Sequence, residues 1–374
     1  MVGAQESGLI LVIALMMAML TALGGSKNQS VLVDIPLNVS YSQPDDATLI
    51  VAGTVYKSDA GWNIRDTENG GHFARGQQRV NRFFEKENLI QQTTTASFIA
   101  VMAVGMTAII VLAGIDISIG SIYGLAAMLG AMAVSHLDSV APVYSAVPLG
   151  LMICCCVGAA CGFMNGALSV GLRVHPFIIT LGTMAIFRGI VFVISKGQTV
   201  SGLPDSLQKG FFKLEYNGVF PVPTLIMLFV AVAGMVVLRF TVFGRRVFAV
   251  GGNEIAAKYA GIPVGQIKII VYTLAGLLAG LSACMYMGYF GAAENNAGNG
   301  YELKVIAAAV IGGASLSGGR GSAVGAVLGA ILVQLIDNAM VILDIDQSYN
   351  QIVMGAAIIV AVVIDQTKGR MSGR

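Results

Sequence analysis

The sequence is poor in charge and in the residues that most often carry enzyme chemistry. Only 11% of its 374 residues are charged, it has three histidines and one tryptophan, and 56% of its residues are hydrophobic. Soluble domains contain roughly 45 to 50% apolar and about 25% charged residues. The composition therefore excludes an ordinary soluble protein and predicts an all-α polytopic protein in a lipid bilayer. The net charge of +2 is too small to indicate nucleic-acid binding.

The few histidines and cysteines are poorly placed for a metal site or a disulfide. The three histidines are far apart in predicted loops, and Cys154, Cys155, Cys156 and Cys161 share one apolar run. Successive residues of a helix point about 100° apart, so three in a row cannot converge on one metal ion. We interpret the cysteines as small packing residues and expect no metal.

A phosphate-binding lysine is also lacking. The segment Gly312 to Ser322 reads GGASLSGGRGS, which partly resembles the nucleotide-binding pattern G-x-x-x-x-G-K-[ST]. The glycine pair Gly313 and Gly318 is followed by Gly319 instead of lysine. We therefore expect no ATPase site, no enzyme activity and no cofactor in this chain, so any energy from ATP must come from another subunit.

Long apolar runs predict about ten membrane spans, because a helix needs about 17 to 25 residues to cross a bilayer. The runs are Gly8–Leu23, Ala96–Gly114, Ile117–Val134, Val143–Val170, Pro176–Ser195, Pro221–Phe243, Gln266–Phe290, Val305–Leu316, Ser322–Leu343 and Gln351–Ile364. The eighth is short and rich in glycine, so we expect a broken or re-entrant segment there.

Basic residues orient these spans, because cytoplasmic loops carry an excess of Lys and Arg. With the N-terminus inside, the inner loops contain Arg173, Arg245, Arg246, Lys258, Arg320, Lys368, Arg370 and Arg374. Short outer loops are acidic and contain Asp138, Glu294, Glu302, Asp344 and Asp346. The loop at 196–220 has three lysines and is the exception. The pattern predicts that both termini are cytoplasmic.

The polar stretch at 24–92 does not fit the bundle. It contains Trp62 and two alternating runs, Val31 to Ser40 and Thr48 to Lys57, separated by Gln-Pro-Asp-Asp. This pattern predicts a small extracytoplasmic β-rich insert. The predicted organisation is a first span at 1–23, the insert at 24–92, a transmembrane core at 93–366 and a cytoplasmic tail at 367–374.

A short polar helix at 253–261 lies between two apolar runs. Asn253 can cap its start, Glu254 lies in the first turn, where the helix dipole favours a negative charge, and Gly261 can end it. With Ala256, Ala257 and Lys258 it forms about two turns. Its position predicts a docking element for a soluble cytoplasmic partner.

Two helix breaks have alternative interpretations. The glycines at Gly312 and Gly313 either let helices approach closely or interrupt a helix beside the substrate path. Asp116 is either a functional intramembrane carboxylate or the N-cap of the next helix at the inner interface. Ser118 and Ser121 then lie in the first turn of that helix and can satisfy free backbone amides.

Other polar residues lie within the predicted spans. Arg188 either extends its charged end to the membrane interface, pairs with a carboxylate such as Asp337, or lines the permeation path. The neutral groups of Asn165, Tyr286 and Asn338 suit a polyhydroxylated solute better than an ion. Hydrogen bonds between helices are their commoner use.

Several segments together carry a family resemblance. They are Asn88-Leu-Ile-Gln-Gln-Thr, Ala103-Val-Gly-Met-Thr, Gly114-Ile-Asp-Ile-Ser-Ile-Gly-Ser, Gly251-Gly-Asn-Glu-Ile-Ala-Ala-Lys-Tyr-Ala-Gly-Ile, Gly300-Tyr-Glu-Leu and Ile306-Ala-Ala-Ala-Val-Ile-Gly-Gly-Ala-Ser-Leu-Ser-Gly-Gly-Arg-Gly. The chain resembles the permease subunits of bacterial ABC importers for monosaccharides, the ribose and galactose type within the branched-chain-type permease superfamily.

The resemblance implies a permease of the bacterial cytoplasmic membrane that works by alternating access, with two copies forming the pathway. It also implies a cytoplasmic subunit that binds ATP and magnesium, and an extracytoplasmic sugar-binding protein. Glu254, Ala256, Ala257 and Gly261 match the family's E-A-A…G loop, whose short helix sits in a cleft of the ATPase. The insert departs from the family, and it either borders the docking surface of the binding protein or fills the rim.

Other functions stay open. The same machine could import a nucleoside or a furanosyl signalling molecule. An ion-coupled secondary transporter is a different class, but the spans contain few acids that could relay protons, and the polar cytoplasmic helix would lack a purpose in it.

Overall fold

A computed structural model describes residues 2–36, 39–66, 72–137, 141–216 and 218–371. Asp138 and Arg374, which entered the orientation argument, and the last three residues of the predicted tail lie outside these ranges. The chain forms two compact units. A helical unit comprises residues 1–15, 90–341 and 345–374, and a second unit comprises residues 16–89 and 342–344.

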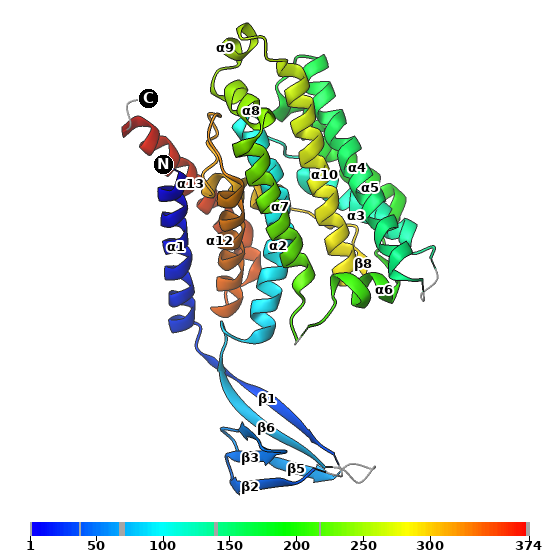
Figure 1. Cartoon of the computed structure of the whole chain (residues 1–374), viewed down its shortest axis with the longest axis vertical. Helices are drawn as coiled ribbons and strands as arrows, with labels where there is room; N and C mark the ends of the chain where they lie inside the picture. Colours follow the sequence, from blue (N-terminus) through cyan, green and yellow to red (C-terminus); the bar gives the residue numbers. More distant parts are fainter. Residues whose placement is uncertain (1, 37–38, 67–71, 138–140, 217, 372–374) are drawn as a thin grey trace. The chain divides into compact units, whose positions relative to one another are not determined.

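Each predicted span corresponds to one helix (Figure 1). These helices are α1 Val2–Leu23, α2 Lys86–Val111, α3 Ile119–Val134, α4 Val143–Gly171, α5 Pro176–Ser195, α7 Pro221–Phe240, α10 Val264–Phe290, α11 Tyr301–Ile311, α12 Ala323–Ile342 and α13 Asn350–Met371. Among the described residues, seven helices (α1, α2, α4, α5, α7, α10 and α12) are long and apolar enough to cross a membrane. The mostly helical membrane architecture is therefore confirmed.

Shorter elements connect these helices. They are β7 Val200–Ser201, α6 Asp205–Leu207, a π-helix Gln208–Phe212, α8 Val242–Gly252, α9 Glu254–Tyr259, β8 Ala292–Ala293 and a 3-10 helix Gln347–Tyr349. Helix α8 was not predicted, because the apolar run that begins at Pro221 continues to Phe243. The chain instead becomes extended at Thr241, whose hydroxyl accepts a hydrogen bond from Gly244 N–H and caps the new helix.

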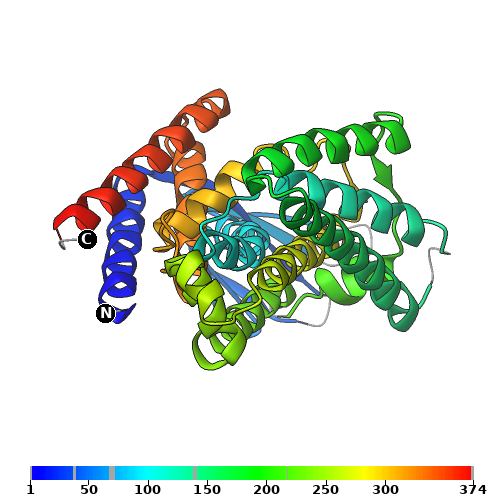
Figure 2. The same ribbon diagram turned by 90° about the horizontal axis from the view of Figure 1, so that it is seen from above.

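Small residues let the helices of the bundle pack closely. Helices α4 and α10 are in such contact, where a Cβ added to Gly158 or to Gly276 would lie 2.2 Å from the carbonyl oxygen of the other. No other residue type fits such a backbone contact. Helix α2 is nearly enclosed by its neighbours, as the view along the helices shows (Figure 2). In its most apolar stretch of 18 residues, 89% is buried.

The second unit contains the predicted insert, whose β-rich character is confirmed. Strands β1 Ser26–Ile35, β6 His72–Asn81 and β5 Asn63–Asp66 form one antiparallel sheet, and β2 Tyr41–Asp45, β3 Thr48–Val51 and β4 Thr54–Lys57 form another. The second alternating run is a hairpin rather than one strand, because Ala52 and Gly53 both have positive φ and make a tight turn. Pro44 belongs to the Gln-Pro-Asp-Asp segment that was expected to separate the two runs, but it lies in β2. Strand β2 is at the edge of its sheet, where a residue without a backbone N–H is tolerated.

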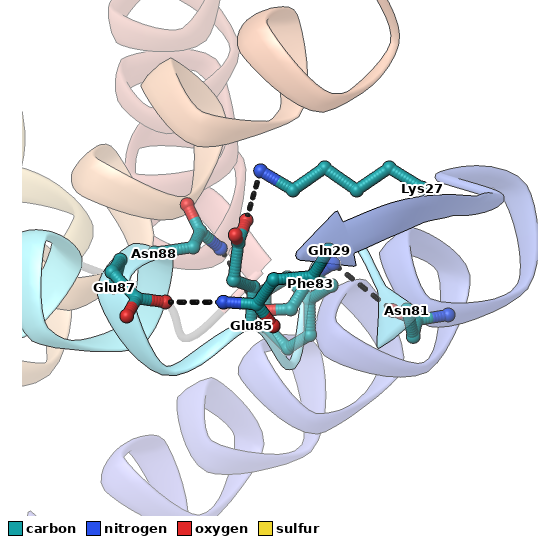
Figure 3. Close-up of polar contacts among 7 residues, drawn as sticks. All are labelled: Lys27, Gln29, Asn81, Phe83, Glu85, Glu87 and Asn88. Carbon is teal, nitrogen blue, oxygen red and sulfur yellow. Dashed lines mark hydrogen bonds and ion pairs between the residues drawn. The ribbon is translucent and has the colours of Figure 1, made fainter. Parts of the chain in front are cut away.

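Polar contacts join β1 to the start of α2 within the second unit (Figure 3). Lys27 Nζ lies 2.6 Å from Glu85 Oε2, and Gln29 donates to Glu87 at 3.4 Å. Asn88 Nδ2 donates to the carbonyl of Phe83 at 2.9 Å. The first turn of α2 is therefore linked to the strand that opens the insert.

Candidate functional site

The predicted docking helix is present as α9 and is capped as expected. The side chain of Asn253 accepts a hydrogen bond from Ala256 N–H at 2.9 Å, and Glu254 occupies the first turn. Gly261 follows the helix with a φ of 77°, a left-handed conformation that ends helices and favours glycine. Lys258 lies in the last turn, where its charge complements the helix dipole.

One face of α9 is uncovered at an end of the helical unit (Figure 1). Ile255 and Tyr259 are 70% and 89% exposed, and their spacing of four residues puts them on the same side of the helix. Ala257 is buried and anchors the opposite side. Glu254 pairs with Lys268 at 2.8 Å. The helix therefore presents an apolar pair, with a charge beside it, to the surroundings.

The residues just before α9 are clamped between two other segments. A Cβ on Gly251 would lie 1.6 Å from the carbonyl oxygen of Val111, at the end of α2. The same carbonyl accepts a hydrogen bond from Gly319 N–H at 2.9 Å. Gly318 is close on the other side, since its added Cβ would lie 2.5 Å from the carbonyl oxygen of Gly251. The end of α8, just before α9, therefore touches both the end of α2 and the glycine-rich loop.

The glycine-rich loop both ends α11 and packs closely. Helix α11 stops at Ile311, and Gly313 has a φ of 99°. A Cβ on Gly312 would lie 2.3 Å from the carbonyl oxygen of Gly325 in α12. Both interpretations of this stretch thus have a structural counterpart: helices approach closely at Gly312, and a helix is interrupted there.

Asp116 lies in the turn between α2 and α3 and is completely buried. Its Oδ1 accepts hydrogen bonds from Ser118 N–H at 2.8 Å and from Ser118 Oγ at 2.6 Å, and Asn165 Nδ2 of α4 lies 3.4 Å from its Oδ2. The N-cap interpretation is wrong in detail, because Ser118 occupies the cap position of α3. Burial raises the pKa of the Asp116 carboxyl, and the hydrogen bonds from Ser118 and Asn165 act in the opposite direction.

This turn is held by side chains from three further helices. Asn165 donates to Ser118 Oγ at 2.7 Å and accepts from Thr183 of α5 at 2.8 Å. Tyr272 of α10 donates to the carbonyl of Ile115. The sequence identified Asn165 but missed the threonine and tyrosine, because hydroxyl groups in apolar helices give no pattern that distinguishes them from packing residues.

Arg188 does not pair with Asp337. Its Nη1 donates to the carbonyl oxygen of Ala297, in the loop after β8, at 2.7 Å. Asp337 is instead paired with Lys304 at 2.6 Å and accepts a hydrogen bond from Asn350 at 2.7 Å. Lys304 is therefore the ion-pair partner of Asp337, and Arg188 instead holds the loop after β8.

The structure brings some of the candidate residues together and leaves others apart. Ser121 joins the Asp116 turn, since its hydroxyl donates to the carbonyl of Ser118 at 2.8 Å. Tyr286 lines a separate pocket with Tyr123 and Phe98, and Asn338 is buried in α12. Within the described ranges, no three His, Cys, Asp or Glu side chains are grouped as metal ligands.

Comparison with known proteins decides the class. Residues 88–362 match the family described as branched-chain amino acid transport system / permease component. The chain belongs to this family. It is therefore a multi-pass permease component, a transport subunit and not an enzyme, as the sequence analysis predicted.

Three relatives show the breadth of the similarity. The ribose import permease protein RbsC of Escherichia coli K12 is 39% identical over 77% of this chain and 87% of its own length. The D-allose transport system permease protein AlsC of the same organism is 37% identical over 76% of this chain and 85% of its own. The autoinducer 2 import system permease protein LsrC of Klebsiella pneumoniae is 33% identical over 76% and 80%. No solved structure matches the chain.

Proposed function

We propose that this chain is the membrane permease of an ATP-driven, binding-protein-dependent importer for a monosaccharide. The relatives named for ribose and D-allose match it over most of their length. A separate cytoplasmic subunit binds ATP and magnesium, and an extracytoplasmic sugar-binding protein delivers the solute. Aromatic rings and polar groups that can accept or donate hydrogen bonds line the pocket around Tyr286, which suits a polyhydroxylated solute such as a sugar.

The exposed face of α9 is the observation that carries the coupling mechanism. Ile255 and Tyr259 project from a capped helix, and the described residues leave them 70% and 89% exposed. In our proposal they seat in a groove of the ATPase. Closure of the ATPase moves α9, and the backbone contacts of Gly251 pass that motion to Val111 and the glycine-rich loop, which shifts the permease between two states.

The proposed topology has ten crossings with both termini in the cytoplasm of a bacterial cell. In this arrangement α11, with 11 residues, is a half-span that ends at the glycine-rich loop. Two copies of the chain form the pathway. Cysteine variants placed at 245–246 in α8 and at 294–296 in the loop after β8 test the orientation through their reaction with membrane-impermeant thiol reagents in intact cells.

Docking by α9 is tested with Ile255→Asp, which puts a charge on the proposed contact without disturbing a buried residue. We expect the variant to reach the membrane normally, to lose co-purification with the ATPase and to import sugar at less than a tenth of the normal rate. The matched control is Tyr144→Asp, at an 82% exposed residue outside α9. Normal co-purification of the Ile255→Asp variant would show that α9 is not the docking element.

The role of Glu254 can be separated from that of its ion pair. Glu254→Arg reverses the charge at position 254 and also breaks the ion pair with Lys268. Lys268→Ala breaks the ion pair alone. We expect only Glu254→Arg to uncouple ATP hydrolysis from uptake. If Lys268→Ala has the same effect, the ion pair rather than the docking surface is responsible.

The insert is proposed to border the surface where the binding protein docks. Replacing residues 26–81 with a short Gly-Ser linker should lower binding-protein-dependent uptake while the bundle remains in the membrane. Unchanged uptake would show that the insert only fills the rim.

A furanosyl signalling molecule is the second candidate solute, because a relative named for autoinducer 2 import matches the chain. Competition distinguishes the two. Uptake of labelled ribose or allose that is blocked by excess autoinducer 2 at lower concentrations than by either sugar would favour the second candidate.

A further inference from the structure

An open pocket of about 650 Å³ lies among α2, α3, α10 and the loop before α11, all within the helical unit. Its wall combines aromatic rings with polar groups. The aromatic residues are Phe98, Tyr123, Tyr286, Phe290 and Tyr301, and the polar ones are Thr95, Glu294, Asn296 and Asn299. Glu294 and Asn296 are exposed, so the pocket is wet at its mouth and aromatic at its base.

The aromatic base is a continuous cluster rather than scattered rings. The ring centre of Tyr123 lies 5.5 Å from that of Tyr286 and 5.3 Å from that of Tyr301, and Tyr286 lies 5.3 Å from Phe290. Rings at these distances support one another in tilted contacts. They give the pocket a rigid apolar surface large enough to cover one face of a six-membered or five-membered sugar ring.

The loop that supplies the polar groups is held in place. Gly298 has a φ of 74°, and a Cβ on it would lie 2.2 Å from the carbonyl oxygen of Gly120 in α3. Arg188 fixes the neighbouring carbonyl of Ala297 at 2.7 Å. The polar groups near Asn296 are therefore positioned before any ligand arrives, which lowers the entropy cost of binding.

One group at the base lacks a partner. The hydroxyl of Tyr123 is completely buried, and no described residue forms a hydrogen bond with it. Buried hydroxyls are nearly always paired, so an orphan calls for an explanation. A solute hydroxyl that enters the pocket supplies the missing partner.

We propose that this pocket is a solute subsite of the permease that binds a neutral, monosaccharide-sized polyol. The apolar face of the sugar lies on Tyr286 and its neighbours, one hydroxyl pairs with Tyr123, and others bond the Glu294 carboxylate and the Asn296 amide. The inference rests on the proposed function in sugar import and adds the place where this chain itself contacts the solute. An apolar solute would leave Glu294 and Asn296 unsatisfied, and an anion would be repelled by the carboxylate.

Tyr123→Phe tests the role of the hydroxyl with little change in packing. Proteoliposomes with the permease, its ATPase and its binding protein are assayed for uptake of labelled D-ribose and D-allose. We expect at least a threefold lower uptake rate, with normal amounts of assembled complex. A merely structural tyrosine predicts no loss, because its hydroxyl forms no hydrogen bond with any described residue. The matched control is Tyr144→Phe, at an exposed tyrosine outside the pocket.

A second measurement does not depend on transport. Asn296→Cys is made in a background where Cys155 and Cys156, the two cysteines that are not buried, are replaced by serine. D-Ribose or D-allose at millimolar concentration should slow maleimide labelling of the new cysteine, whereas a buffer brought to the same osmolarity with sodium chloride, with neither sugar, should not.

The outcomes separate the subsite from the proposed function. Normal import by the wild type, together with unchanged import by Tyr123→Phe and no protection at position 296, overturns the subsite and leaves sugar import standing. Failure of the wild type to import either sugar overturns the proposed function. In that case, protection of position 296 by a sugar still supports the pocket, and no protection overturns it.

Discussion

The helical unit and the insert are stabilised in opposite ways. The insert has a core of six buried residues, which are Val33, Ile35, Leu49, Val51, Trp62 and Ala74. The core of the helical unit contains many times more buried residues, and alanines, glycines and aliphatic side chains dominate it. One unit therefore depends on a few large side chains, and the other on many close approaches of small ones.

The difference reflects the two solvents. In water, burial of large apolar side chains drives folding, so a small domain needs a residue such as Trp62. In a bilayer the lipid is as apolar as the side chains, and helices gain more from van der Waals contact between backbones that small residues bring together. A substitution that is mild in one unit should therefore be severe in the other.

The largest effect is predicted for Trp62→Ala in the insert. The tryptophan is 9% exposed, and its Nε1 donates to the carbonyl of Ala47 at 3.2 Å. Trp→Ala changes in cores lower the free energy of unfolding by about 3–5 kcal/mol. In a core of six described buried residues, we expect this loss to unfold the insert. We expect rapid proteolysis within 26–81 in the intact membrane protein, with the bundle unaffected. Leu32→Ala, at a 67% exposed residue of β1, is the control, and equal proteolysis in both variants would contradict the prediction.

The next largest effect is predicted for Gly276→Ala in the bundle. The added methyl group would lie 2.2 Å from the carbonyl oxygen of Gly158, so α4 and α10 must separate. Overpacking costs about 1–3 kcal/mol, and backbone at the contact cannot rotate away. We expect a lower unfolding temperature in detergent and less protein in the membrane. Gly182→Ala on α5, with nothing within 4 Å of its new methyl group, should show no loss, and similar losses in both variants would argue against close packing.

The sequence predicted the elements of both units better than their contacts. Apolar length predicted the ten helices, and local caps predicted α9, because both signals lie within a few residues of the feature that they specify. The end of α7 at Thr241 was missed, since the apolar run gives no sign of a bend. Alternation indicated β1, β3 and β4, but it did not indicate β2, β5 or β6, nor that Pro44 lies within a strand.

Contacts between distant segments could not be read from the sequence in the same way. Nothing near Arg188 indicates that it bonds Ala297, more than a hundred residues away, and the pairing with Asp337 was a choice by charge alone. The clamp on Gly251 is equally hidden, because glycine gives no signal of what approaches it. Charge and polarity indicate which residues need a partner, and only the fold supplies the partner's identity.

A smaller effect is predicted for Asp116→Asn, and it depends on pH. Burial raises the pKa of this carboxyl in the folded state above 3.8, the ordinary value. Protonation therefore favours the folded state, and the contribution of this group to stability is fully present below pH 3.8 and is lost as pH rises through the higher folded-state pKa. Asparagine keeps the acceptor for Ser118 and cannot ionise.

We therefore expect Asp116→Asn to remove part of the loss of stability that the wild type shows as pH rises from 3.8, measured as unfolding temperature in detergent. The effect is smaller than that of Gly276→Ala because the hydrogen bonds on Oδ1 are retained. Asp205→Asn, at an exposed carboxylate of α6, is the control. If the unfolding temperature of the Asp116→Asn variant falls more steeply with rising pH than that of the wild type, the ionised carboxylate is stabilised by its neighbours rather than destabilised by burial.

The smallest effect is predicted at the contact between Lys27 and Glu85 (Figure 3). The two side chains are 45% and 13% exposed and 2.6 Å apart, and ion pairs that reach water contribute about 0–1 kcal/mol. Lys27→Ala should therefore change the proteolysis rate of the insert far less than Trp62→Ala, and high salt should remove the difference from wild type, because salt screens exposed charges. The double variant Lys27→Ala/Glu85→Gln, compared with the two single variants, gives the coupling energy between the two side chains. A coupling above about 1 kcal/mol that persists in high salt would show that the insert depends on this link as much as on its core.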